Sequence, residues 1–229
     1  LHGGGWALGY AQSYDAFCAD LARESGAAVL ALDYRLAPEH PFPAAVEDAC
    51  FALDWLAAHG AALGLDVARL AVAGDSAGGN LAAVAALSAR DALWPRLRMQ
   101  LLIYPVASQS LDGESMAAFG DGFLLDQATL AWFQSLYLPG PDLSRDWRAS
   151  PADALFLGNL PPTRIVLAQC DPLRDAALAY ARALAAAGVA VAVDEVPGMI
   201  HGFITMGRLF PQAGAAIERA GRALREALG

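Results

Sequence analysis

Residues 74–78 read Gly-Asp-Ser-Ala-Gly, and this pentapeptide constrains the fold more than any other feature of the sequence. It follows an apolar run at 69–74 and precedes an alanine-rich stretch at 77–89. A serine flanked by small residues at a strand-to-helix turn is held strained and exposed, because the small neighbours let the two backbones approach closely. The following helix points the positive end of its dipole at the serine, where it favours negative charge. The motif therefore predicts a strand-turn-helix unit with Ser76 as a nucleophile.

Short apolar runs alternate with alanine-rich amphipathic stretches along most of the chain. The runs predicted to be buried strands are 28–34, 69–74, 99–104, 164–170 and 189–196. The stretches predicted to be helices are 13–25, 44–62, 77–89, 174–187 and 212–228. This alternation predicts an α/β fold with a mostly parallel sheet and helices on both faces. With 229 residues, 56% of them hydrophobic, the chain is long enough to bury the core of one such domain.

One segment, 107–160, interrupts this alternation. It contains clusters of Gly, Pro and Asp and one helical patch at 127–138, and it is longer than a crossover connection requires. We therefore predict a catalytic domain formed by residues 1–106 and 161–229, with 107–160 inserted as a cap or lid over the carboxyl edge of the sheet. The aromatic residues Trp132, Phe133, Tyr137 and Phe203 are candidates for an acyl-binding pocket. Ordinary packing of the three aromatics on the cap helix is an equal alternative.

A serine nucleophile needs a base, and the chain has four histidines. Three of them have plain structural settings: His2 and His40 flank glycine or proline turns, and His59 lies near the end of a predicted helix. A lone histidine is more often a structural residue than a catalytic one. His201, however, is the only histidine after Ser76, and it follows the last predicted strand. This position favours His201 as the catalytic base.

In strand-turn-helix serine hydrolases, the acid that orients the base lies between the serine and the histidine in the sequence. The candidates are Asp171, Asp175, Asp194 and Glu195. Asp171 directly follows the strand at 164–170 and precedes Pro172, which places it at the carboxyl edge of the sheet, where ligands bind. Asp175 begins a predicted helix, and the other two lie at the end of the last strand. We therefore select Asp171.

Residues 2–6 read His-Gly-Gly-Gly-Trp. Glycines let backbone N–H groups face a cavity without obstructing side chains, and a developing oxyanion needs such donors. Gly3, Gly4 and Gly5, together with the N–H of Ala77 beside the nucleophile, are the predicted oxyanion hole. Loss of one donor of this kind typically costs about 3–4 kcal/mol of transition-state stabilisation.

Composition argues against several other classes of function. The formal net charge is −9 with no basic cluster, so a nucleic-acid partner is not expected. The chain has no Lys, which excludes Schiff-base chemistry and a phosphate-binding lysine. The cysteines, Cys18, Cys50 and Cys170, have no metal-site spacing, so free thiols are expected. No apolar run reaches the roughly 20 residues of a spanning helix, so we expect no membrane segment and a cytoplasmic location.

These motifs together resemble the hormone-sensitive-lipase-like esterases, also called bacterial lipolytic family IV. The matching stretches are HGGGW (2–6), DYRLAPEHPFPAAVEDA (33–49), GDSAGGNLA (74–82), YP (104–105), DPLRD (171–175) and GMIHGF (198–203). The resemblance implies an α/β-hydrolase fold, a triad of Ser76, Asp171 and His201, and an oxyanion hole from the glycines and Ala77. It also implies hydrolysis of small-molecule esters with short to medium acyl chains, through an acyl-enzyme and without a cofactor or metal.

Two alternatives stay open. Plant gibberellin receptors resemble this family, so a non-catalytic small-ligand receptor is one, although such receptors lack the base histidine and this chain has His201. The other is hydrolysis of a different acyl substrate, such as a lactone, an amide or an acetylated sugar, because the triad serves all of these. The sequence also leaves the oligomeric state open, a homo-oligomer included.

The sequence departs from the family pattern at its beginning. Members of the family resembled here carry further strands and part of the cap before the HGGG loop, whereas this sequence starts at Leu1. The strand leading into that loop would lie between the strands at 28–34 and 69–74. We therefore expect these elements to be missing and residues 1–229 alone to fold poorly and hydrolyse slowly.

Overall fold

The computed structural model describes residues 1–229, except for the side chain of Pro141. Within the described residues, the sheet has four parallel strands in the order β1-β2-β3-β4. The strands are β1 (Leu70–Asp75), β2 (Leu97–Ile103), β3 (Thr163–Cys170) and β4 (Val191–Ile200). Their register pairs Asp75 with Ile103 and Cys170 with Ile200. Because the strands are parallel, their carboxyl ends lie along one edge of the sheet.

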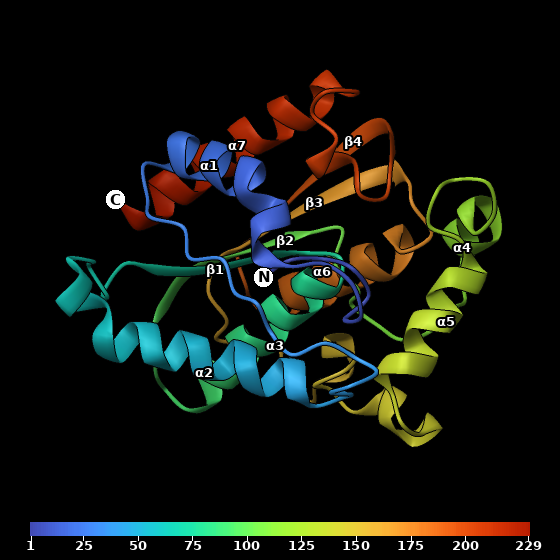
Figure 1. Ribbon diagram of the computed structural model, residues 1–229, viewed down its shortest axis with the longest axis horizontal. Helices are drawn as coiled ribbons and strands as arrows, with labels where there is room; N and C mark the ends of the chain where they lie inside the picture. The colour runs from blue at the N-terminus through green and yellow to red at the C-terminus, as the bar shows by residue number, and fades with distance from the viewer.

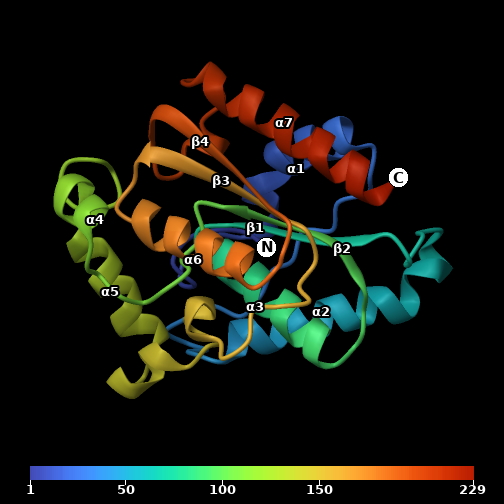
Figure 2. The same ribbon diagram turned by 180° about the vertical axis from the view of Figure 1, so that it is seen from behind.

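Helices cover both faces of this sheet, as the sequence predicts. Helices α1 (Asp15–Ser25) and α7 (Pro211–Leu228) lie on one face, and α2 (Ala44–His59), α3 (Ala77–Asp91) and α6 (Arg174–Ala186) lie on the other (Figures 1 and 2). Short 3-10 turns precede α1 at Ala11–Tyr14 and follow α2 at Gly60–Leu63. The α/β fold class predicted from the alternating pattern is confirmed.

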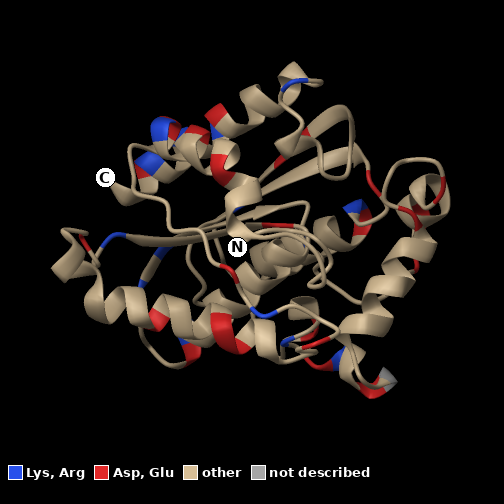
Figure 3. Cartoon of the chain, in the orientation of Figure 1, with Lys and Arg blue, Asp and Glu red and all other residues tan. Residues whose placement is uncertain are grey.

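The two central strands explain why the pattern was so clear. Leu101, Leu102 and Ile103 of β2 and Ile165, Val166 and Leu167 of β3 are at most 1% exposed. Strands covered on both faces bury every side chain, so their sequences read as continuous apolar runs. Charged residues lie mainly on the outer helices and loops, and the strands are mostly uncharged (Figure 3).

The prediction of a strand at 28–34 is wrong. The segment forms no helix or strand, and in the described part of the chain no backbone hydrogen bond joins it to a strand. Val29 and Leu30 are 38% and 54% exposed. A β-strand needs a neighbour to pair with, and residues 1–229 place no strand between this segment and β1. The free edge of β1 is contacted instead by Leu1, whose terminal N donates to the Ala73 carbonyl at 2.9 Å.

The segment 107–160 contains α4 (Glu114–Phe119), α5 (Gln127–Tyr137) and the 3-10 turns Pro141–Arg145 and Pro151–Asp153. The helix predicted at 127–138 is present, whereas α4 was not predicted. Figure 1 shows α4 and α5 together at one end of the molecule, next to α6. Asn80 of α3 holds the segment at two points, since its side-chain amide donates to the carbonyls of Val106, just before the segment, and Ala149, within it, each at 2.8 Å.

Among the described residues, no helix combines the length and the apolar character needed to cross a bilayer.

Candidate active site

Ser76 sits at the turn between β1 and α3 in a conformation that serines rarely adopt. Its φ is 55° and its ψ is −119°. The turn is held by the Ser76 N–H, which donates to the Ile103 carbonyl at 2.9 Å, and by the Ser76 carbonyl, which accepts from Asn80 N at 3.0 Å. A Cβ at Gly74 would lie 2.1 Å from the Gly78 carbonyl oxygen, so strand and helix can approach this closely only through glycine. The local sequence thus fixes where the hydroxyl lies.

The structure brings the three predicted triad residues into one hydrogen-bonded row. His201 Nε2 lies 2.9 Å from Ser76 Oγ, and His201 Nδ1 lies 2.7 Å from Asp171 Oδ2. A carboxylate only accepts hydrogen bonds, so Nδ1 carries the proton and Nε2 is free to accept one from the serine. Asp171 is 1% exposed, and its other oxygen accepts from Leu173 N at 2.8 Å. This is the geometry that nucleophile activation requires.

The sheet explains how residues far apart in sequence meet here. Ser76, Asp171 and His201 directly follow β1, β3 and β4, whose carboxyl ends share one edge. Strand β2 lies between β1 and β3 and is followed by Tyr104, whose ring centroid lies 4.6 Å from that of His201. Tyr104 is 1% exposed and closes the face of the imidazole. All four strands therefore contribute to the placement of the row.

The other carboxylates considered for the acid have different partners. Asp175 Oδ2 accepts from the Ser115 backbone N–H at 2.8 Å. Asp194 pairs with Arg219 at 2.7 Å, and Glu195 pairs with Arg174 at 3.3 Å. The structure connects Asp171, and none of these three, to His201.

The glycine loop lies beside Ser76, but its three glycines are not equivalent. The N–H of Gly3 donates to Asp75 Oδ1 at 2.8 Å and to Tyr14 Oη at 3.1 Å, so it is already engaged and does not serve as an oxyanion donor. Gly4 and Gly5 have φ values of 115° and 59°. Ala77 is the first residue of α3, where backbone N–H groups have no partner within the helix. The candidate donors are therefore Gly4, Gly5 and Ala77.

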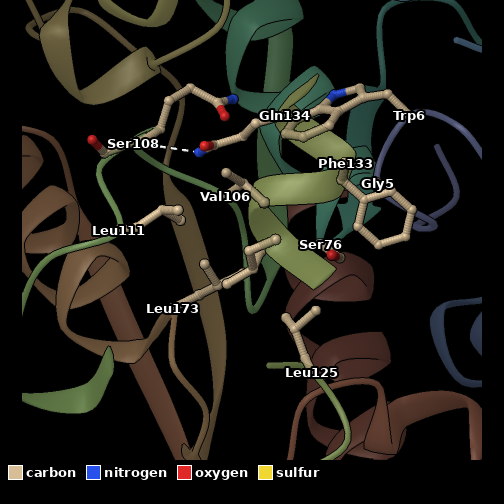
Figure 4. A pocket seen from close by; sticks show the side chains of 12 residues that line it. Gly5, Trp6, Ser76, Val106, Ser108, Leu111, Leu125, Phe133, Gln134 and Leu173 are labelled. Atoms are coloured by element: carbon tan, nitrogen blue, oxygen red, sulfur yellow. Dashed lines mark hydrogen bonds between the residues drawn. The ribbon is translucent and has the colours of Figure 1, made fainter. Parts of the chain in front are cut away.

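A narrow pocket of about 30 Å³, partly open to solvent, lies beside Ser76 (Figure 4). It is lined by Gly5, Trp6, Ser76, Val106, Ser108, Gln109, Leu111, Leu125, Leu130, Phe133, Gln134 and Leu173. Most of these side chains are apolar, and several come from the 107–160 segment. A hydrocarbon chain could therefore pack against these side chains next to the Ser76 hydroxyl.

Of the four aromatic residues predicted for the pocket, only Phe133 lines it. Trp132 is 49% exposed on the outside of α5. Tyr137 is fully buried and stacks on Trp6, with ring centroids 4.3 Å apart and an interplanar angle of 2°. Phe203 is fully buried too and packs against Tyr104 at 5.9 Å. The last two belong to the core, because on a helix or a short turn only one side can face the pocket.

Sequence reasoning missed the aliphatic pocket residues. Leu173 lies two residues after Asp171, and Val106 lies two residues after Tyr104. Residues just beyond the carboxyl ends of strands gather where ligands bind in such sheets. Their positions shortly after the strand ends could therefore have identified Leu173 and Val106 as pocket residues from the sequence.

The site also holds buried groups that the triad does not use. Burial raises the pKa of the Asp75 carboxyl above its ordinary value, although the Tyr14 hydroxyl donates to it. Burial likewise raises the pKa of Tyr14, and the neighbouring Asp75 adds to the shift. In the described part of the chain, no group of three or more His, Cys, Asp or Glu residues is placed to hold a metal ion.

Comparison with known proteins places this geometry in a family. A family model described as alpha/beta hydrolase fold matches residues 1–205. The chain is 42% identical to an ethyl acetate hydrolase of Pseudomonas putida over 231 residues, covering 100% of this chain and 72% of the relative. It is also 42% identical to a carboxylesterase of Mycobacterium tuberculosis, covering 99% of this chain and 72% of that protein.

Solved structures agree with the sequence relatives. A thermostable carboxylesterase cloned from a metagenomic library superposes with a TM-score of 0.97 at 40% identity, covering 100% of this chain and 78% of that one. A thermostable esterase from Pseudomonas putida superposes with a TM-score of 0.96 at 41% identity, covering 100% of this chain and 73% of that one. The chain therefore belongs to the hormone-sensitive-lipase-like, or bacterial lipolytic family IV, carboxylesterases of the α/β-hydrolase superfamily.

Proposed function

We propose that Ser76, His201 and Asp171 are the catalytic triad of this ester hydrolase and that its substrates are esters of short- to medium-chain acids. The observation that carries the proposal is the row in which His201 links Ser76 Oγ at 2.9 Å and Asp171 Oδ2 at 2.7 Å. A receptor on the same fold has no use for a base bonded to its serine, so this row favours the enzyme.

In the proposed mechanism, Ser76 Oγ attacks the ester carbonyl carbon while His201 Nε2 takes the hydroxyl proton. The carbonyl oxygen becomes an oxyanion, which accepts hydrogen bonds from the N–H groups of Gly4, Gly5 and Ala77. His201 then gives its proton to the departing alcohol, leaving the acyl group on Ser76. A water molecule attacks this acyl-enzyme, His201 takes the water proton and returns it to Ser76 Oγ, and the acid leaves.

The pocket supports a small apolar acyl group. Its volume of about 30 Å³ between Phe133 and the aliphatic side chains around Ser76 favours a chain of a few carbons over a long one. A relative at 42% identity carries the name ethyl acetate hydrolase, which agrees with a small acyl group. We also propose that 107–160 acts as the cap of the catalytic domain, since α5 supplies Phe133 and Gln134 to this wall.

A chain-length series of p-nitrophenyl esters tests the proposal. We expect kcat/KM to be highest between acetate and hexanoate and to fall for longer acyl groups. Ser76→Ala should abolish turnover and also labelling by a fluorophosphonate probe, because the nucleophile is gone. Labelling or normal turnover by the Ser76→Ala variant would refute the assignment of the nucleophile. A maximum with lactones, amides or acetylated sugars would replace the substrate class while keeping the triad.

A further inference from the structure

Asp75, the residue before the nucleophile, is buried beside the site and takes no part in the row described above. It is 4% exposed. One carboxylate oxygen accepts from the Gly3 N–H at 2.8 Å, and the other accepts from the Tyr14 hydroxyl at 3.0 Å. The Gly3 N–H also lies 3.1 Å from Tyr14 Oη. Three groups from separate parts of the chain thus form one closed hydrogen-bonded set.

A side chain at position 3 would displace the groups of this set. A Cβ at Gly3 would lie 2.5 Å from Asp75 Oδ2 and 3.1 Å from Tyr14 Oη, so the carboxylate would have to move. Gly3 lies directly against the carboxylate, and the next two residues are the candidate oxyanion donors Gly4 and Gly5. The loop position just before the donors is thereby tied to the residue just before the nucleophile.

Other bonds hold the neighbouring groups of the loop. The Gly3 carbonyl oxygen lies 2.7 Å from His2 Nδ1, and the Gly4 carbonyl accepts from Leu8 N at 2.9 Å. The Tyr34 hydroxyl donates to the His2 carbonyl at 2.7 Å, and the rings of the same two residues stack with centroids 4.3 Å apart. Those contacts fix residue 2. Only Asp75 and Tyr14, among the described residues, accept from the N–H of Gly3.

We propose that Asp75 and Tyr14 are positioning residues that hold the oxyanion loop at its working distance from Ser76. Oxyanion donors must lie 2.7–3.1 Å from the oxygen in the transition state, whereas the neutral carbonyl of the bound ester depends on them less. A loop released from Asp75 would therefore lower kcat and leave KM nearly unchanged. The inference rests on the proposed ester hydrolysis at Ser76.

The experiment compares wild type with Asp75→Ala, Asp75→Asn and Tyr14→Phe, using p-nitrophenyl butyrate as substrate. We expect Asp75→Ala to lower kcat about 100-fold with KM changed less than about threefold, matching the loss of one oxyanion donor. Asp75→Asn keeps an oxygen that can accept from Gly3, so it should recover most of that loss. Tyr14→Phe should cost about fivefold. Tyr10→Phe is the control, since Tyr10 is 58% exposed and lies outside this set.

Two further readouts separate positioning from a general loss of structure. A trifluoromethyl ketone forms a tetrahedral oxyanion adduct with a nucleophilic serine, so its inhibition constant should weaken in Asp75→Ala by the same factor as kcat/KM. The double variant Asp75→Ala with Tyr14→Phe should lower kcat by less than the product of the two single effects, because Asp75 and Tyr14 bond to each other and to the same Gly3 N–H.

Wild-type kcat in Asp75→Ala, or a fall in kcat with an unchanged inhibition constant for the ketone, overturns the proposal. If thermal melting shows that Asp75→Ala does not fold, Asp75→Asn and Tyr14→Phe decide by the same criteria. The Ser76→Ala variant separates the positioning role from the proposed function. Suppose that wild type is active, Ser76→Ala is inactive and Asp75→Ala equals wild type. Ester hydrolysis at Ser76 then stands, and the positioning role is refuted. If Ser76→Ala is as active as wild type, the proposed function itself fails, and the positioning role fails with it.

Discussion

The edge of the sheet and the segment 107–160 both border the pocket, but they are held in different ways. At the sheet edge, Ser76 is fixed by backbone hydrogen bonds and Asp171 is 1% exposed. In the segment, side chains such as Leu124 and Leu155 are 65% and 106% exposed, and the Asn80 side chain bonds to the carbonyls of Val106 and Ala149. The strand ends therefore hold the proposed triad firmly, whereas the proposed acyl-binding wall has weaker support.

The largest effect is expected at the sheet edge. Asp171→Asn should lower kcat by about 10⁴-fold, because an amide in place of the carboxylate favours the wrong tautomer of His201. Steady-state kinetics with p-nitrophenyl butyrate measure this loss, and an unchanged melting temperature shows that the fold is intact. A loss of less than tenfold would mean that another group orients His201.

The core beneath this edge should be sensitive where the outer surface of the segment is not. Leu101→Ala in β2 should lower the free energy of unfolding by about 2–5 kcal/mol, because the residue is fully buried and leaves a cavity. Trp132→Ala on the outside of α5 should change it by less than about 1 kcal/mol. Urea denaturation measures both. Equal losses would abolish the contrast between the two regions.

The junction between the regions should give an intermediate effect. Asn80→Ala removes the donors for the Val106 and Ala149 carbonyls and should cost about 1–3 kcal/mol of stability, because the buried Val106 carbonyl is left unpaired and the Ala149 carbonyl keeps only the Gln109 amide as a donor. Gln127→Ala, at an exposed position in α5, is the matched control. If both variants unfold at the same urea concentration as wild type, Asn80 does not fasten the segment.

The segment should act on specificity rather than on the chemical step. A Cβ at Gly5 would lie 2.2 Å from the Phe133 ring, so this ring closes the pocket directly over the glycine loop. Phe133→Ala should enlarge the pocket and raise kcat/KM for octanoate relative to acetate esters by about tenfold. The neighbouring Trp132→Ala should leave that ratio unchanged. An identical shift in both variants would mean that the whole helix has moved.

The smallest effect is expected from pH at the outer end of the segment. The hydrogen bonds that Arg148 donates lower the pKa of the Asp146 carboxyl. Because the folded-state pKa lies below the unfolded one, this pair stabilises the fold above the ordinary pKa of Asp and loses that contribution as pH falls through the folded value. The contribution should be under about 1 kcal/mol. Urea denaturation should separate wild type from Asp146→Asn at pH 7, and the difference should shrink as the pH is lowered below the ordinary pKa of Asp; a constant difference would contradict this.

Local patterns were enough to predict most of the fold and the row at Ser76. The motif at 74–78 specifies its own turn, and Asp171 and His201 follow apolar strands that any α/β sheet would align. The failures involve pairing in space. The segment 28–34 has the apolar sequence of a strand but no neighbouring strand to pair with. Tyr137 is an aromatic residue on the helix that borders the pocket, but its ring stacks on Trp6 instead of lining the pocket. The engagement of Gly3 by Asp75 depends on a contact 72 positions apart, which no local pattern reveals.

The strand order gives this enzyme a built-in reporter of complete assembly. Because Ser76 follows β1 and His201 follows β4, at opposite sides of the described sheet, we expect the row to form only after all four strands have docked. A chain diluted from denaturant can regain helical signal and collapse while its last strand is still unpaired. Hydrolytic rate should therefore be the final property to return, and its lag behind circular dichroism would time the docking of β4.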